Sequence, residues 1–244
     1  SIDRHCCLLI LCAIIAGMFF VLIALLLFAV LFGPQLWVRA VIKRHSRPRE
    51  DYPGTGSEFA HHLLNQLDMS RIGVETSEKG DHYDPLTRKV RLSPENFDGK
   101  SLAAVAIAAH EVGHALQDRL GYRPLRWRTR LALFANLAQQ LGNGLIILAP
   151  LASALTRAPS SALLMLAAGL ASFGTAALVH LVTLPVEWDA SFRRALPLLE
   201  AGDYLSSDDL RNARQILTAA ALTYVAGSLA SLLNLWRWLR LLKR

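Results

Sequence analysis

Two histidines and a glutamate share one short stretch of this sequence, residues 106–117, AIAAHEVGHALQ. Their neighbours are mostly strong helix formers, so we expect the stretch to be helical. An α-helix turns once in about 3.6 residues, so His110 and His114 lie on one face and can converge on a single ion. Glu111 lies about 100° around the helix, where it can reach a water on that ion without being a ligand. The spacing therefore predicts a zinc site with Glu111 as the general base.

The sequence around this motif favours the zinc interpretation over a chance match. Ser101 can cap the start of the helix, and Gly121 stands where a helix of this length would end. The helix is apolar on nearly every side and should be buried, where two imidazoles and a carboxylate are costly without a metal or partners. The alternative is a histidine pair that only caps or packs.

A catalytic zinc needs a third protein ligand, and Glu187 in LPVEWDASFRRAL is the best candidate. It follows an apolar stretch directly and comes soon after Pro185, in a segment with little other need for a carboxylate. The alternative is a glutamate at a membrane interface that only reaches toward water. The other candidates for the third ligand are histidines: His82, His180, His61 and His62.

Composition predicts an integral membrane protein. The chain has 244 residues, of which 53% are hydrophobic, and a formal net charge of +7. The basic residues fall in loops beside apolar stretches, so the expected partner is the lipid bilayer and not a nucleic acid. The cysteines all lie at or inside the first apolar run, so we expect no disulfide framework and no cysteine metal site.

Four apolar stretches are long enough to cross a membrane. They are Leu8–Phe32, Leu131–Leu155, Ser160–Leu184 and Ile216–Trp236. Basic residues gather in 39–49 and 119–130, which predicts that the part between the first two stretches is cytoplasmic. The basic tail, 237–244, fits this topology poorly, so either it lies along the interface or the last stretch does not span.

Between the first two apolar stretches the pattern changes to that of a small α+β unit. Residues 57–69 repeat apolar positions at helical spacing, and Ile72–Thr76 is typical of a strand. Asp84-Pro85 is a turn signal between two extended pieces, 81–83 and 89–92, which predicts a hairpin against the histidine helix. Either the edge of this hairpin binds an extended peptide substrate by strand addition, or the hairpin only shields the helix from solvent.

The predicted fold class is a membrane α-helical protein with a small α+β, zincin-like cytoplasmic part. It has about four transmembrane helices, a short β-hairpin or sheet, and the HExxH helix. The expected divisions are a transmembrane anchor (1–38), a metallopeptidase part (39–130), a transmembrane hairpin (131–184), a third-ligand helix and cytoplasmic loop (185–212), and a C-terminal transmembrane helix with its basic tail (213–244).

Three separated motifs carry a family resemblance: AAVAIAAHEVGHALQ, the upstream DHYDP with KVRLS, and the downstream LVTLPVEWDAS. Over roughly residues 50–236 the chain resembles the YugP-type neutral zinc metallopeptidases of bacterial membranes. The resemblance implies a gluzincin site, similar to that of HtpX-type membrane proteases, with Zn²⁺ bound by His110, His114 and Glu187 and with Glu111 as base. It also implies a bacterial inner membrane with the active site on the cytoplasmic side. Related gluzincins often have an aspartate four residues after the ligand glutamate, whereas this chain has Ser191.

The expected activity is hydrolysis of a polypeptide substrate by a zinc-activated water. Oxyanion donors are sought among His82, Tyr83, His180 and Arg193, with preference for the hairpin pair His82 and Tyr83. The second apolar stretch contains four polar residues, for which polar packing between helices is favoured over a hydrated path to the active site. They are Asn136, Gln139, Gln140 and Asn143. The rival function is a zinc-stabilised membrane scaffold without turnover, and a transporter is a weaker third interpretation because no inverted repeat is seen.

Overall fold

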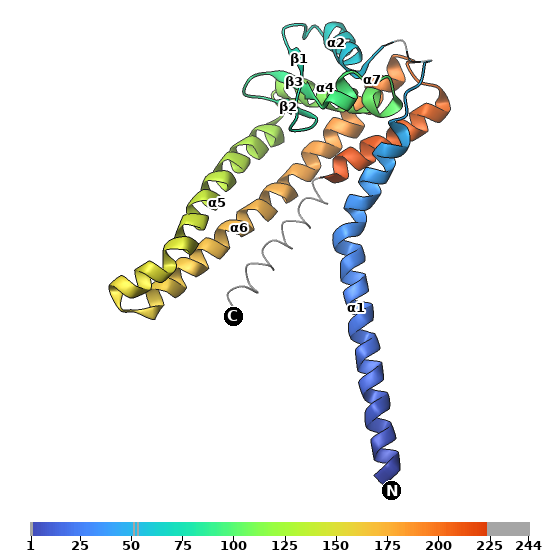
Figure 1. Cartoon of the computed structure of the whole chain (residues 1–244). Helices are drawn as coiled ribbons and strands as arrows, with labels where there is room; N and C mark the ends of the chain where they lie inside the picture. The colour runs from blue at the N-terminus through green and yellow to red at the C-terminus, as the bar shows by residue number, and fades with distance from the viewer. Residues whose placement is uncertain (1, 51, 53, 224–244) are drawn as a thin grey trace.

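The computed structural model describes residues 2–50, 52 and 54–223. Figure 1 shows two regions: a head, in which the short helices and the strands gather, and long helices that extend away from it. The long helices are α1 (Ile2–His45), α5 (Arg123–Thr156) and α6 (Pro159–Trp188). The head contains α2 (Gly56–Gln66), β1 (Gly73–Thr76), β2 (His82–Asp84), β3 (Lys89–Leu92), α3 (Pro94–Phe97), α4 (Leu102–Arg119) and α7 (Leu196–Ala201).

Helices α5 and α6 form a tightly packed hairpin. Arg157 ends α5 in the left-handed conformation, with φ of 53°, and α6 begins two residues later. Small residues let the two helices approach closely, because a Cβ atom on Gly142 would lie 3.1 Å from the carbonyl oxygen of Gly169. The two glycines therefore set the spacing of this hairpin.

The prediction of about four transmembrane helices is wrong. Among the described residues one helix, α5, is long and apolar enough to cross a membrane. An apolar run of the right length does not by itself distinguish a span from a helix that packs against protein. The run at 160–184 lies in α6, which packs along α5, and much of the run at 216–236 lies outside the described residues.

The histidine helix α4 is the centre of the head. Ser101 caps its start, where the Ser101 hydroxyl accepts a hydrogen bond from the Ala104 amide at 3.1 Å. The chain leaves its end through Gly121, which has φ of +66°. Apolar side chains from α2, β3, α7 and the helix at 207–223 bury α4 on nearly all sides, as its composition predicts: Leu63, Leu64, Val90, Leu92, Leu199, Ile216 and Leu217.

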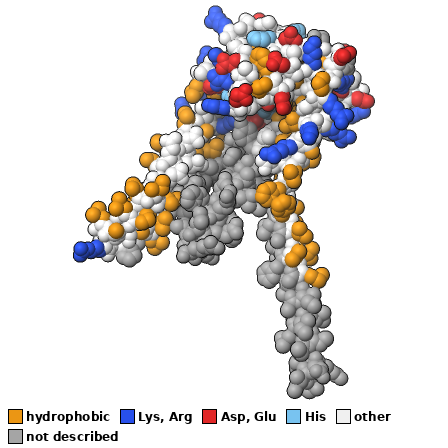
Figure 2. All heavy atoms as spheres, viewed as in Figure 1, with side chains coloured by type: hydrophobic (Ala, Val, Ile, Leu, Met, Phe, Trp, Pro, Cys, Tyr) orange, Lys and Arg blue, Asp and Glu red, His pale blue; other side chains and the backbone are white. Residues whose placement is uncertain are grey.

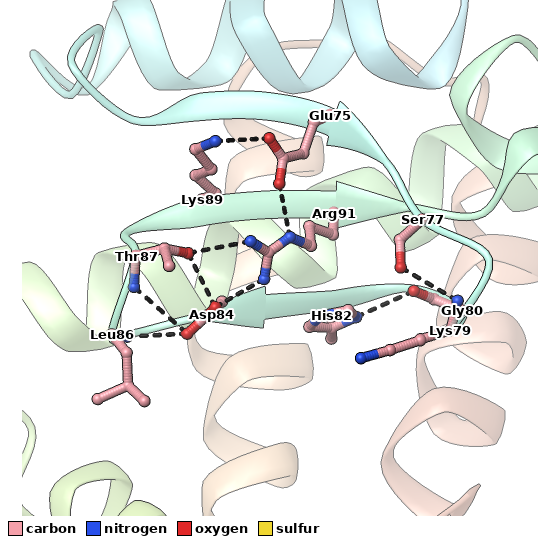
Figure 3. Close-up of polar contacts among 10 residues, drawn as sticks. All are labelled: Glu75, Ser77, Lys79, Gly80, His82, Asp84, Leu86, Thr87, Lys89 and Arg91. Atoms are coloured by element: carbon pink, nitrogen blue, oxygen red, sulfur yellow. Dashed lines mark hydrogen bonds and ion pairs between the residues drawn. The ribbon is translucent and has the colours of Figure 1, made fainter.

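The sheet has the strand order β1-β3-β2, with β1 parallel and β2 antiparallel to β3. The predicted hairpin is present as β2 and β3, and Tyr83 pairs with Val90 across it. On the other face Arg91 of β3 donates to Glu75 of β1 at 2.7 Å and to Asp84 of β2 at 2.6 Å (Figure 3). The guanidinium of Arg91 thus links all three strands. The strand order places β2 at an edge of the sheet.

After α6 the chain changes helical pitch. Residues Asp189–Ala195 form a π-helix, η1, which packs against α4 before α7 begins. Gly113 of α4 permits this contact, because a Cβ atom there would lie 2.8 Å from the carbonyl oxygen of Ala190. Single π-turns inside helices often occur at functional sites, and this one begins two residues after Glu187.

Candidate metal centre

His110, His114 and Glu187 meet inside the head. Each is at most 4% exposed, and one donor atom from each lies within 4.8 Å of the others. The Oε2 atom of Glu187 is 3.1 Å from Nε2 of His110 and 3.2 Å from Nε2 of His114. Glu187 is 77 positions from His110 and 73 positions from His114 in the sequence. The packing of η1 on α4 brings the three residues together.

The outer nitrogen of each ring is held by an acceptor. Ser191 donates its hydroxyl hydrogen to the Leu217 carbonyl at 3.1 Å, so its oxygen is left to accept from Nδ1 of His110 at 3.0 Å. The Gln117 amide nitrogen faces the carbonyl of Val186, so its oxygen accepts from Nδ1 of His114 at 2.9 Å. This pattern assigns the ring protons to Nδ1 and the lone pairs of both Nε2 atoms to the centre.

The donor set fits a zinc ion. Two imidazole lone pairs and a carboxylate oxygen point at one another, which is unfavourable unless a cation lies between them. Zinc bonds of about 2.0–2.2 Å in a tetrahedron separate neighbouring ligand atoms by about 3.4 Å, close to the contacts of Glu187 with the two rings. Three protein ligands leave a fourth position, as in catalytic zinc sites.

Glu111 lies beside this centre with one unused oxygen. It is 5% exposed, and among the described residues its Oε2 atom has no hydrogen-bond partner. Burial raises the pKa of Glu111 to about 7. A buried carboxylate with an unmatched oxygen and a pKa near neutrality suits a group that exchanges a proton with water.

The third-ligand candidate is charged despite its burial. Burial alone would raise the pKa of Glu187, but the charge and hydrogen bonds that His114 and His110 supply when they are protonated, together with the charge of Arg128, hold it well below its usual range. Arg128 of α5 places its Nη1 atom 3.0 Å from Oε1 of Glu187. The two carboxylate oxygens therefore have different partners.

A cavity of about 300 Å³ opens onto the centre. Its lining includes the three candidate ligands, Glu111, Arg128, the edge-strand residues His82 and Tyr83, and Asp81 just before that strand. A second cavity of about 190 Å³ shares Tyr83, His114 and Arg128 with the first and continues between the β2–β3 turn and α5, as far as Asn136. The edge of the sheet and the start of α5 thus form the walls of the approach to the centre.

The predicted oxyanion donors differ in their surroundings. The Tyr83 hydroxyl donates to Asp118 at 2.9 Å, and burial together with this bond raises its pKa well above the usual value. His82 bonds through Nδ1 to the Gly80 carbonyl at 3.0 Å and lines the cavity. Arg193 lines a different hollow with Tyr122 and Trp188. The Tyr83 hydroxyl hydrogen is thus already used. The Nε2 atom of His82 makes no hydrogen bond to the residues that the structure describes.

The other predicted ligands lie away from the centre or outside the described part. His62 bonds to the Tyr204 hydroxyl at 2.9 Å in a separate cavity. His61 does not belong to the metal-ligand group found among the described residues. The side chain of His180 lies outside those that the structure describes.

Sequence reasoning missed the residues that orient the centre. Gln117 follows His114 by three positions, on the same helical face, so its spacing carried a usable signal. In the sequence, Ser191 stands out only as a departure from the aspartate of related gluzincins. Arg128 was one of several arginines in a basic cluster, and nothing in its spacing separated it from the others.

Comparison with known proteins gives two matches. The family model described as "Putative neutral zinc metallopeptidase" matches residues 19–243. A protein of Bacillus subtilis (strain 168) with the name "Putative membrane protease YugP" is 31% identical over 223 residues, which cover 91% of this chain and 95% of that protein. No solved structure matches the chain significantly.

Proposed function

This chain belongs to the neutral zinc metallopeptidase family, and from that premise we propose that it is an endopeptidase whose zinc is held by His110, His114 and Glu187. The observation that carries the proposal is the convergence of two ring nitrogens and one carboxylate oxygen beside the unmatched oxygen of Glu111. A zinc ion bound there would supply a Lewis acid for the scissile carbonyl and would lower the pKa of a bound water toward about 7.

The chain's own residues account for the proton transfers. Glu111 accepts a proton from the attacking water and returns it to the leaving amine, so no covalent intermediate is needed. His82 lines the same cavity and is the proposed donor to the developing oxyanion. Because β2 lies at an edge of the sheet, its outer backbone groups would pair with an extended peptide and hold the peptide along the same wall.

We further propose that the protein is associated with a membrane and has its active site on the cytoplasmic face. The named relative is a membrane protease, and α5 is long and apolar enough to cross a bilayer. Basic residues lie where α1 ends and α5 begins, which agrees with the positive-inside bias. They include Arg39, Lys43, Arg44, Arg123, Arg126 and Arg130.

The test is a comparison of wild type with Glu111→Gln in zinc content and casein cleavage. We expect both to bind one zinc per chain, and the variant to lose at least about 10²-fold in kcat because the proton acceptor is gone. Glu95→Gln, an exposed glutamate in α3, is the matched control and should keep wild-type activity. Equal cleavage by wild type and Glu111→Gln would contradict the proposed role, and zinc bound with no cleavage by either would favour the scaffold.

A further inference from the structure

Arg128 contacts the oxygen of Glu187 that the two histidines do not contact. Oε2 of Glu187 lies 3.1 and 3.2 Å from the two Nε2 atoms, whereas Oε1 lies 3.0 Å from Nη1 of Arg128. The Arg128 contact is an ion pair and not a well-directed hydrogen bond, since Oε1 accepts no hydrogen bond from any residue that the structure describes. The carboxylate is thus divided, with one oxygen at the centre and the other beside a cation.

Burial makes this ion pair consequential. The Glu187 side chain is 1% exposed and the Arg128 side chain 21% exposed, so water screens the pair poorly. A buried carboxylate that loses its cationic partner is left with an uncompensated charge. It would then gain by turning its second oxygen toward another cation, and the metal centre is the nearest place for one.

We propose that Arg128 is a positioning residue that keeps Glu187 a one-oxygen ligand of the metal. A carboxylate can bind a metal through one oxygen or through both. If Glu187 bound through both, its second oxygen would raise the coordination number from four to five and crowd the position that a catalytic zinc keeps for water. By holding Oε1, Arg128 preserves that open position. The inference rests on the proposed function, because it assumes that Glu187 is a ligand.

The placement of Arg128 in the fold supports a role at the centre and not only in helix packing. It lines the cavity that contains Glu111 and also the neighbouring cavity that contains His114. Helix α5 begins four residues after α4 ends, which keeps its first turns close to the histidine helix. The helix that is apolar enough to cross a membrane therefore also carries the residue that fixes the third ligand.

The experiment compares wild type with Arg128→Met and Arg128→Lys after loading with Co²⁺, whose visible absorption weakens as coordination rises above four. We expect Arg128→Met to bind one metal per chain, to absorb about half as strongly as wild type, and to lose at least about tenfold in kcat with little change in KM. Arg128→Lys should stay within about threefold of wild type, because the contact depends on charge. Arg130→Met, an exposed arginine two residues along the helix, is the matched control.

Three results would overturn the inference: a wild-type spectrum in metal-loaded Arg128→Met, loss of the metal from that variant, or equal defects in the Met and Lys variants. Arg128→Gln, which is polar but uncharged, gives the same comparison if the Met variant does not fold. The spectrum is read without turnover, so it separates this inference from the peptidase proposal. Failure of wild type itself to bind metal would count against the proposed function.

Discussion

At the residue scale, the geometry of the candidate metal centre depends on hydrogen bonds between the ligand histidines and residues that are not ligands. His110 and His114 each use one nitrogen for the centre and one for a neighbour, Ser191 or Gln117. Gln117 is fully buried and also donates to Asp189 at 2.8 Å, which Arg194 contacts from the other side at 3.1 Å. The orientation of one ring is therefore tied to a chain of contacts that ends near the surface.

Ser191→Ala tests this arrangement. The change leaves Nδ1 of His110 without its acceptor, so we expect zinc affinity to fall about 10–100-fold, as is usual when the partner of a ligand histidine is removed. The measurement is competition for zinc with a chelator of known affinity. Ser172→Ala, which removes a serine-to-carbonyl bond within α6, is the matched control and should bind zinc as wild type does. Unchanged affinity in Ser191→Ala would show that the ring is oriented by other contacts.

The residue scale also shows what the sequence could predict. His110, Glu111 and His114 are recognisable because one helix holds all three, and helical spacing is readable from sequence. Glu187 is recognisable by its chemistry and by its place after an apolar run. Arg128 cannot be recognised in this way, because its contact with Glu187 depends on how α5 leaves α4 and not on any local pattern. Proximity in space between distant segments is the information that a single sequence carries least.

At the element scale, local signals located most of the head. The strand expected at Ile72–Thr76 is found at Gly73–Thr76, and the piece expected at 81–83 is found at His82–Asp84. The cap at Ser101 and the stop at Gly121 were both readable, because each depends on one residue type in one backbone conformation. The π-helix η1 was not predicted, since it arises where α6 must turn its residues onto α4.

Gly113→Ala tests the contact between α4 and η1. The added Cβ atom would lie 2.8 Å from the backbone oxygen of Ala190, so η1 must shift. We expect the free energy of unfolding to fall by about 1–3 kcal/mol, as for other overpacked sites. Thermal unfolding in the presence of a chelator is the measurement, and zinc affinity should fall as well because η1 follows Glu187.

The control for this change is Gly144→Ala in α5, where an added Cβ atom meets nothing within 4 Å. Alanine is the better helix former by about 1 kcal/mol, so this variant should be as stable as wild type or more so. Changes of opposite sign in the free energy of unfolding at the two glycines would separate the effect of packing from that of helix propensity. If both variants unfold alike, α4 and η1 are not in the close contact described here.

At the scale of the whole molecule, charge and apolar surface are separated. Figure 2 shows acidic and basic side chains gathered over the head and hydrophobic side chains along the leg formed by α5 and α6. Exposed apolar residues of α5 include Phe134, Leu137, Leu141, Leu151 and Leu155. Composition predicted such a division but overcounted the spans, because it cannot tell which apolar runs face lipid and which face another helix.

Leu141→Arg tests whether α5 lies in a membrane. Leu141 is 62% exposed, whereas its neighbour Gly142 is buried against α6, so the Leu141 side chain points away from the helix hairpin. An arginine near the centre of a membrane helix costs about 2.5–3.5 kcal/mol in insertion, so we expect less of the protein to stay in the membrane fraction after alkaline extraction. Leu86→Arg is the matched control, since Leu86 is 72% exposed but lies in the turn between β2 and β3. An equal membrane fraction for both variants would mean that the apolar face of α5 meets something other than lipid.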